Sequence, residues 1–221
     1  MTKRALATFL VLISAARVAA AQDVASMVAD KDAGAELAKI VTSAEQKGLP
    51  IDPIIARVRY AVMMRASAAR IVAAAHGVAA RLEDARNALA PQPTAKDIIA
   101  GEDALGSGVS KKSLQEIRKI SANKPVAVPL GVLAQLVASE VPEKTATKYV
   151  TDLIKHGATA EQLATLGNDV NADVKLGSAA TNALELRMNR LNAVLGAPGA
   201  NADAAASVPT SLQSGDGKKK P

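Results

Sequence analysis

The chain of 221 residues contains no cysteine and no tryptophan, and aromatic residues make up 1% of it. Without thiols it can form neither a disulfide scaffold nor a cysteine-ligated zinc, iron–sulfur or c-type haem centre, and it cannot be a thiol enzyme. Phe9, Tyr60 and Tyr149 are its only aromatic residues, which argues against a protein that holds sugars or bases on aromatic platforms. The length fits one domain or two small ones, with a core large enough to fold without disulfides.

Residues that commonly carry catalysis or bind metals are also scarce. Only His76 and His156 are present, without a His-x-x-x-His or Glu-x-x-His pair, so the sequence predicts no metal site. It has no Gly-x-Ser-x-Gly elbow and no Gly-x-x-x-x-Gly-Lys phosphate loop. The adjacent acids Glu102 and Asp103 would point about 100° apart on a helix, so no facing acid–base pair is expected. We therefore expect no cofactor, no catalytic residue and a non-enzymatic protein.

The first 21 residues have the composition of an export signal. Lys3 and Arg4 precede an apolar run at 5–16, which is shorter than the ~20 residues that cross a bilayer. The small residues at positions 19–21 predict that the signal is cleaved between Ala21 and Gln22. The alternative is that the segment stays uncleaved as an anchor. A Sec-type signal peptide predicts a periplasmic or secreted bacterial protein. No later stretch is predicted to span a membrane.

The basic charge of the whole chain comes from its two ends. Lysine and arginine number 27 against 21 acids, a net charge of +6. Three bases lie in the first 21 residues, and Lys218, Lys219 and Lys220 lie at the other end, so residues 22–217 are neutral. No nucleic acid partner is expected, because nucleic-acid binding needs a basic face in the folded part. Between residues 57 and 86 arginines outnumber acids. These arginines either lie on solvated helix faces or form an anion-binding patch.

Apolar residues recur at intervals of three and four, without the sustained alternation of strands. The clearest face joins Ile71, Ala75, Val78, Leu82, Ala85 and Leu89. Including this face, nine apolar sets begin at Leu37, Ile54, Ile71, Ile98, Leu114, Leu130, Ala146, Leu163 and Ala180. Alanine, the best helix former, is abundant throughout. The sequence therefore predicts an all-α protein of about nine short to medium helices.

The breaks between these helices share a form. They are Gly48-Leu49-Pro50, Gly108-Val109-Ser110, Val141-Pro142 and Gly157-Ala158-Thr159. A glycine or its equivalent ends one helix, and Ser, Thr or Pro starts the next. Several starts lie 16 or 17 residues apart, the scale of helical hairpins in repeat proteins, but 27 residues separate Ser67 from Thr94. The hairpins are expected in a short superhelical array or an irregular bundle.

Composition also suggests how the chain is divided. Residues 1–21 are the expected signal peptide, 22–33 a flexible N-terminal segment and 34–195 the all-α helical domain. Residues 196–221 are rich in Gly, Pro, Ser and Ala with no apolar face, which predicts a disordered low-complexity tail. Two prolines in the segment 123–129 predict an internal linker.

Two stretches of the chain carry a recognisable pattern: Gly48-Leu49-Pro50-Ile51-Asp52-Pro53-Ile54-Ile55-Ala56-Arg57-Val58 and Arg70-Ile71-Val72-Ala73-Ala74. In these stretches the chain resembles exported bacterial all-helical proteins of uncharacterised function. Tyr60-Ala61 stands where that pattern has Glu-Gly. The resemblance implies an exported helical-hairpin protein and implies no catalytic or ligand-binding residues.

The segment from residue 57 to residue 70 is the candidate interaction surface. Tyr, Met and Arg, the residue types enriched at the cores of interfaces, gather there. Its members are Arg57, Tyr60, Met63, Met64, Arg65 and Arg70. Use of the two methionines to fill the core is the alternative. We expect an unknown protein partner; the alternative is an anionic envelope polymer or surface, bound with help from Lys218–Lys220.

Overall fold

The computed structural model describes residues 20–122 and 124–195, and every regular element in them is an α-helix. The order is α2 (Lys31–Gln46), α3 (Asp52–Met63), α4 (Ala68–Ala88), α5 (Ala95–Gly106), α6 (Lys111–Ser121), α7 (Ala127–Ala138), α8 (Glu143–Lys155), α9 (Ala160–Lys175) and α10 (Ala180–Leu195). Residues 20–26 are also helical, which makes ten helices in the described part where about nine were expected. The all-α prediction is confirmed. None of these helices is long and apolar enough to cross a membrane.

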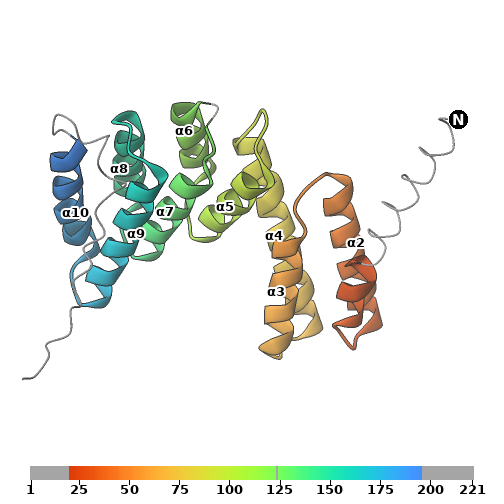
Figure 1. Cartoon of the computed structure of the whole chain (residues 1–221). Coiled ribbons are helices and arrows are strands. Elements are labelled where there is room, and N and C mark those ends of the chain that lie inside the picture. Colours follow the sequence, from red (N-terminus) through yellow and green to blue (C-terminus); the bar gives the residue numbers. More distant parts are fainter. Residues whose placement is uncertain (1–19, 123, 196–221) are drawn as a thin grey trace, which may run out of the picture.

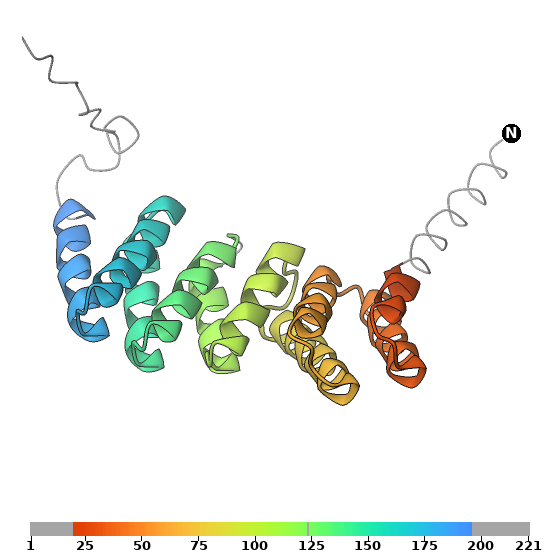
Figure 2. The same cartoon turned by 90° about the horizontal axis from the view of Figure 1, so that it is seen from below.

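The helices form an open two-layer array with α2 and α10 at opposite ends (Figure 1). In one layer α2, α4, α6 and α8 pack side by side, and in the other α5, α7 and α9 do so. Hairpin contacts join the layers, as between α3 and α4, α7 and α8, or α9 and α10. Seen from below, the layers run along one elongated body (Figure 2). Of the two packing modes that the sequence allowed, the array is the one formed.

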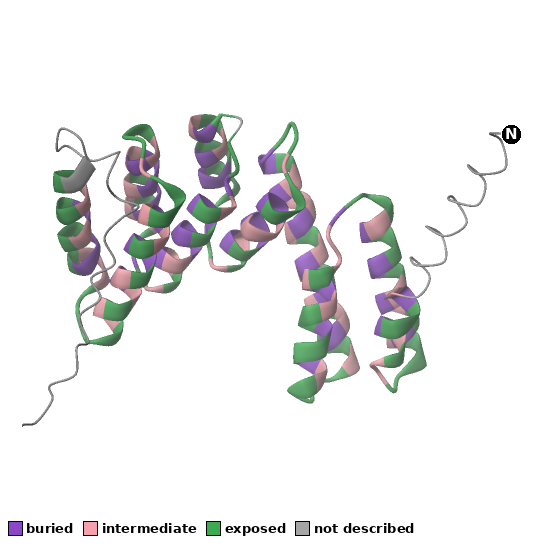
Figure 3. Cartoon of the chain, in the orientation of Figure 1, coloured by how far each residue is buried: buried purple, intermediate pink, exposed green. Residues whose placement is uncertain are grey.

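The apolar faces expected from the sequence are the ones that are buried. On α4, the face from Ile71 to Leu89 lies inside, and Leu82 has no exposed surface. Five other helices also each have a large side chain with no exposed surface: Leu37, Ile54, Leu114, Leu133 and Leu153. Figure 3 shows the buried residues along the helix–helix contacts and the exposed ones on the outside. Because each helix buries one face against its neighbours, a single core runs the length of the array.

The turns repeat one hydrogen-bond pattern. Gly48, Gly108, Gly157 and Gly177 follow helix ends with positive φ, and Arg65 and Glu140 take the same conformation without being glycine. In each case the next residue donates its N–H to a carbonyl five residues back, for example Leu49 to Ala44 at 2.9 Å. This is the Schellman arrangement that ends a helix. The following apolar residue is buried at Leu49, Val109 and Val141. The shared form of the breaks is therefore a repeated structural motif.

Three of the helix starts expected from the sequence carry side-chain caps, whereas Ser67 before α4 makes no side-chain cap. Thr94 and Thr159 form capping boxes with Asp97 and Gln162, and the hydroxyl of Ser110 accepts from the N–H of Ser113. Asp97 is buried, and its carboxylate also accepts from the N–H of Val126 at 2.8 Å. The expected linker is shorter than predicted, because α7 already begins at Ala127.

Part of the N-terminal segment is helical. Within residues 22–33, expected as flexible, residues 22–26 are helical and α2 starts at Lys31. Val24 is fully buried, and a Cβ at Gly34 would lie 2.8 Å from the Ala25 carbonyl oxygen. The close approach at Gly34 explains how this segment docks on α2. Residues 1–19 and 196–221, with most of the expected signal peptide, the expected tail and Lys218–Lys220, lie outside the described residues.

Candidate interaction site

The C-terminal half of α3 exposes three large apolar side chains in succession. Half of Tyr60 is exposed, and the exposed fractions of Met63 and Met64 are 69% and 61%. These residues are three and four positions apart, so they share one side of the helix. Ile54 and Val58 bury the opposite side of α3. Neighbouring large apolar side chains left in water mark contact sites more often than isolated ones do. We call Tyr60, Met63 and Met64 the α3 edge.

The α3 edge is exposed because α3 does not pack extensively on α5. Among the helices α2–α10, α3 packs extensively only against α4, whereas α5, α7 and α9 pack directly on one another. A groove of about 520 Å³ remains between α3, α4 and α5. Its lining residues are Pro53, Ala56, Arg57, Tyr60, Val78, Arg81, Glu102, Asp103, Gly106 and Ser107. Tyr60 belongs both to this α3–α5 groove and to the α3 edge.

An ion pair forms the floor of the α3–α5 groove. Oε1 of Glu102 accepts from Nε of Arg81 at 2.9 Å and lies 2.6 Å from one of its terminal nitrogens. The Glu102 side chain is only 7% exposed. Burial raises the pKa of Glu102, and the favourable charge of Arg81 offsets this shift only in part. The pair therefore fixes α4 to α5 beneath the groove.

Asp103 brings a second carboxyl group to the same place. Burial raises its pKa, and a hydrogen bond shared with Glu102 and the charge of Arg81 oppose the rise. Of the two neighbouring acids, Glu102 alone forms the ion pair with Arg81 from α4, while Asp103 lines the same groove without forming an ion pair with that arginine. The signal available in the sequence was the adjacency of two acids on one short helix.

The predicted surface residues are only partly brought together. The guanidinium of Arg57 lies 5.8 Å from the ring centre of Tyr60, and both line the α3–α5 groove. Met63 and Met64 continue the same side of α3 beyond it, and their exposure argues against the core-filling alternative. Arg65 occupies the turn with positive φ, and Arg70 is exposed in the first turn of α4. Neither Arg65 nor Arg70 is part of the lining of the α3–α5 groove.

The groove presents binding groups rather than a paired nucleophile and base. The hydroxyl of Ser107 donates to the Asp103 carbonyl at 2.9 Å. His76 lies outside the groove, 3.4 Å from Glu36, and His156 contacts the Asp152 carbonyl at the end of α8. No group of three or more His, Asp or Glu in the described ranges could hold a metal ion. Two arginines, two carboxyl groups and a tyrosine beside exposed methionines suit contact with a polypeptide.

Comparison of the chain with models of known protein families, with curated proteins and with solved structures finds no match. Any functional conclusion therefore rests on the geometry of this chain.

Proposed function

We propose that this protein is an exported, non-enzymatic scaffold of the bacterial envelope that binds another protein through the α3 edge and the α3–α5 groove. The observation that carries the proposal is the exposure of Tyr60, Met63 and Met64 beside a groove where one layer of the array is interrupted. The composition of residues 1–21 supports export to the periplasm or the exterior.

A helix of the partner is the occupant that fits this site. In the layer formed by α5, α7 and α9, α5 packs on α7 and α7 packs on α9. A partner helix laid between α3 and α5 would continue that packing. Apolar side chains on one face of such a helix would cover Met63 and Met64, whose unbranched side chains adapt to different shapes. Arg57 and Asp103 stand at the groove to pair with charges that flank the apolar face.

The proposal predicts that removal of the α3 edge abolishes partner binding. The variant Y60S/M63S/M64S should lose at least ~10-fold in affinity, which corresponds to about 1.4 kcal/mol. The measurement is capture of envelope proteins on the tagged protein, quantified by mass spectrometry, followed by calorimetric titration with the partner so identified.

Leu186→Ser is the matched control, because Leu186 is an exposed apolar residue, 51% exposed, on α10. The control should bind like the wild type, and circular dichroism should show the same helix content for all three proteins. Equal recovery of every captured protein by the wild type and the triple variant would rule out the α3 edge.

A further inference from the structure

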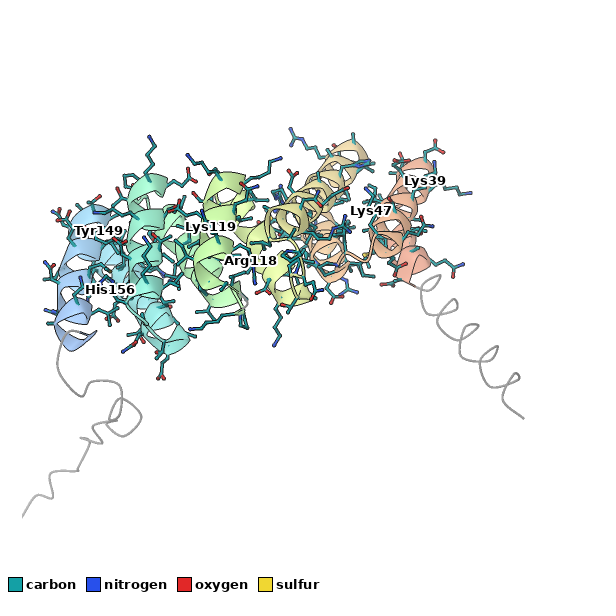
Figure 4. The ribbon with its side chains drawn as sticks, turned by 90° about the horizontal axis from the view of Figure 1, so that it is seen from above. Lys39, Lys47, Arg118, Lys119, Tyr149 and His156 are labelled. Atoms are coloured by element: carbon teal, nitrogen blue, oxygen red, sulfur yellow. The ribbon has the colours of Figure 1, made fainter. Side chains whose placement is uncertain are left out.

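Basic residues concentrate on two adjacent helices of the layer formed by α2, α4, α6 and α8. Together α6 and α8 carry seven lysines and arginines against three acids. In the other layer, α5 and α9 carry two lysines against six acids, and α7 has no charged residue. In Figure 4, seen from above, Arg118 and Lys119 are labelled on α6, and Lys39 and Lys47 are labelled on α2 and just after it. The neutral total of residues 22–217 thus conceals a separation of charge between the layers.

A groove of about 380 Å³ runs between α6 and α8. It is lined by Ser110, Lys112, Ser113, Glu116, Glu143, Lys144, Thr147, Lys148, Thr151, Asp152 and Lys155. Lys112, Lys144 and Lys148 form no ion pair with any described residue. Three cations without partners therefore border one polar groove.

Three acids also line this groove: Glu116, Glu143 and Asp152. Asp152 pairs with Lys155 at 3.7 Å, and Glu143 is engaged in hydrogen bonds. Its carboxylate accepts from the N–H of Ser110 and from the hydroxyl of Ser113, both at 2.8 Å. These hydrogen bonds lower the pKa of Glu143. The negative charge of Glu143 thus stabilises the start of α6, where a helix dipole favours an anion. Lys144 contributes to the lowered pKa through its charge, but Glu143 forms no direct ion pair with the three lysines.

We propose that the α6–α8 groove binds a linear anionic polysaccharide. Lys144 and Lys148 are one turn apart, about 6 Å along the helix axis, and Lys112 faces them from α6, so the cations can meet successive charged groups of one extended chain. A groove of this size admits a single chain rather than a duplex. The ring centre of Tyr149 lies 5.6 Å from Nζ of Lys148, and no aromatic side chain of the described residues lines the groove, so charge rather than stacking would hold the ligand. This surface lies in the opposite layer from α3 and is independent of the scaffold proposal.

The test is binding of the purified protein to heparin as a function of salt. Wild type should bind at low ionic strength and weaken steeply as salt rises, since each contact releases counterions. The variant K112Q/K144Q/K148Q should bind at least ~10-fold more weakly at low salt, with a flatter salt dependence. The variant K31Q/K96Q/K175Q removes the same charge from exposed lysines on other helices and should keep wild-type affinity.

Three outcomes would overturn the inference. They are equal losses in the two triple variants, loss of all binding on deletion of Lys218–Lys220 alone, and tighter binding to phosphatidylglycerol vesicles or duplex DNA than to heparin. Equal helix content of the variants by circular dichroism excludes unfolding as the cause of a loss.

Discussion

Replacement of Leu82 by alanine is expected to lower the free energy of unfolding by about 3 kcal/mol. Leu82 has no exposed surface and lies in α4, which packs against α2, α3, α5 and α6. Truncation removes buried methyl groups and leaves a cavity, because neighbours on four sides cannot all move inward. Urea unfolding followed by circular dichroism measures the effect, with a shift of the midpoint at an unchanged slope.

Leu186→Ala is the control for this prediction, since it removes the same atoms from a side chain that is 51% exposed. It should change the free energy of unfolding by less than about 0.5 kcal/mol. A loss below about 1 kcal/mol for Leu82→Ala would contradict the role of α4 as the helix that joins the two layers.

Replacement of Asp97 by alanine is expected to cost about 2–3 kcal/mol. The Asp97 carboxylate accepts from the N–H and the hydroxyl of Thr94 at 3.0 and 2.8 Å, and from the N–H of Val126 at 2.8 Å. Alanine would leave two backbone donors without partners in a buried setting. Asp97 ties the start of α5 to the segment before α7, so hydrogen exchange at Val126 should accelerate along with the loss of stability.

The same residue makes stability depend on pH in a defined direction. Burial would raise the pKa of Asp97, but the hydrogen bonds from Thr94, Val126 and Ala127 outweigh it, so the pKa lies below its ordinary value of 3.8. The contribution is present above pH 3.8 and is lost as the pH falls through the lowered folded-state value. Asp97→Asn should flatten this part of the stability profile between about pH 5 and pH 2. An unchanged profile in Asp97→Asn would contradict the assignment.

The helices and turns could be predicted because each leaves a local signal. The face from Ile71 to Leu89 repeats at helical spacing, and burial of that face follows from the period alone. Gly48, Gly108 and Gly157 mark positions where the backbone needs positive φ. Arg65 and Glu140 take the same conformation without being glycine. The turn at Arg65 therefore has no glycine that would have indicated it in the sequence.

The candidate site depends on contacts between distant segments, which local patterns do not contain. Exposure of Tyr60, Met63 and Met64 follows from the missing packing between α3 and α5. The 27-residue interval between Ser67 and Thr94 spans the long helix α4 and coincides with that interruption. Arg81 is 21 residues from Glu102 in the chain, so their ion pair could not be found before the packing of α4 on α5 was known.

The most direct test of the central proposal is photo-crosslinking in the bacterial envelope. A photoreactive amino acid in place of Met63 should give one discrete adduct with a partner protein, and the Tyr60→Ser substitution should reduce it. The same group in place of Leu186 should give no such adduct. Absence of an adduct at position 63, or the same products at both positions, would contradict binding at the α3 edge.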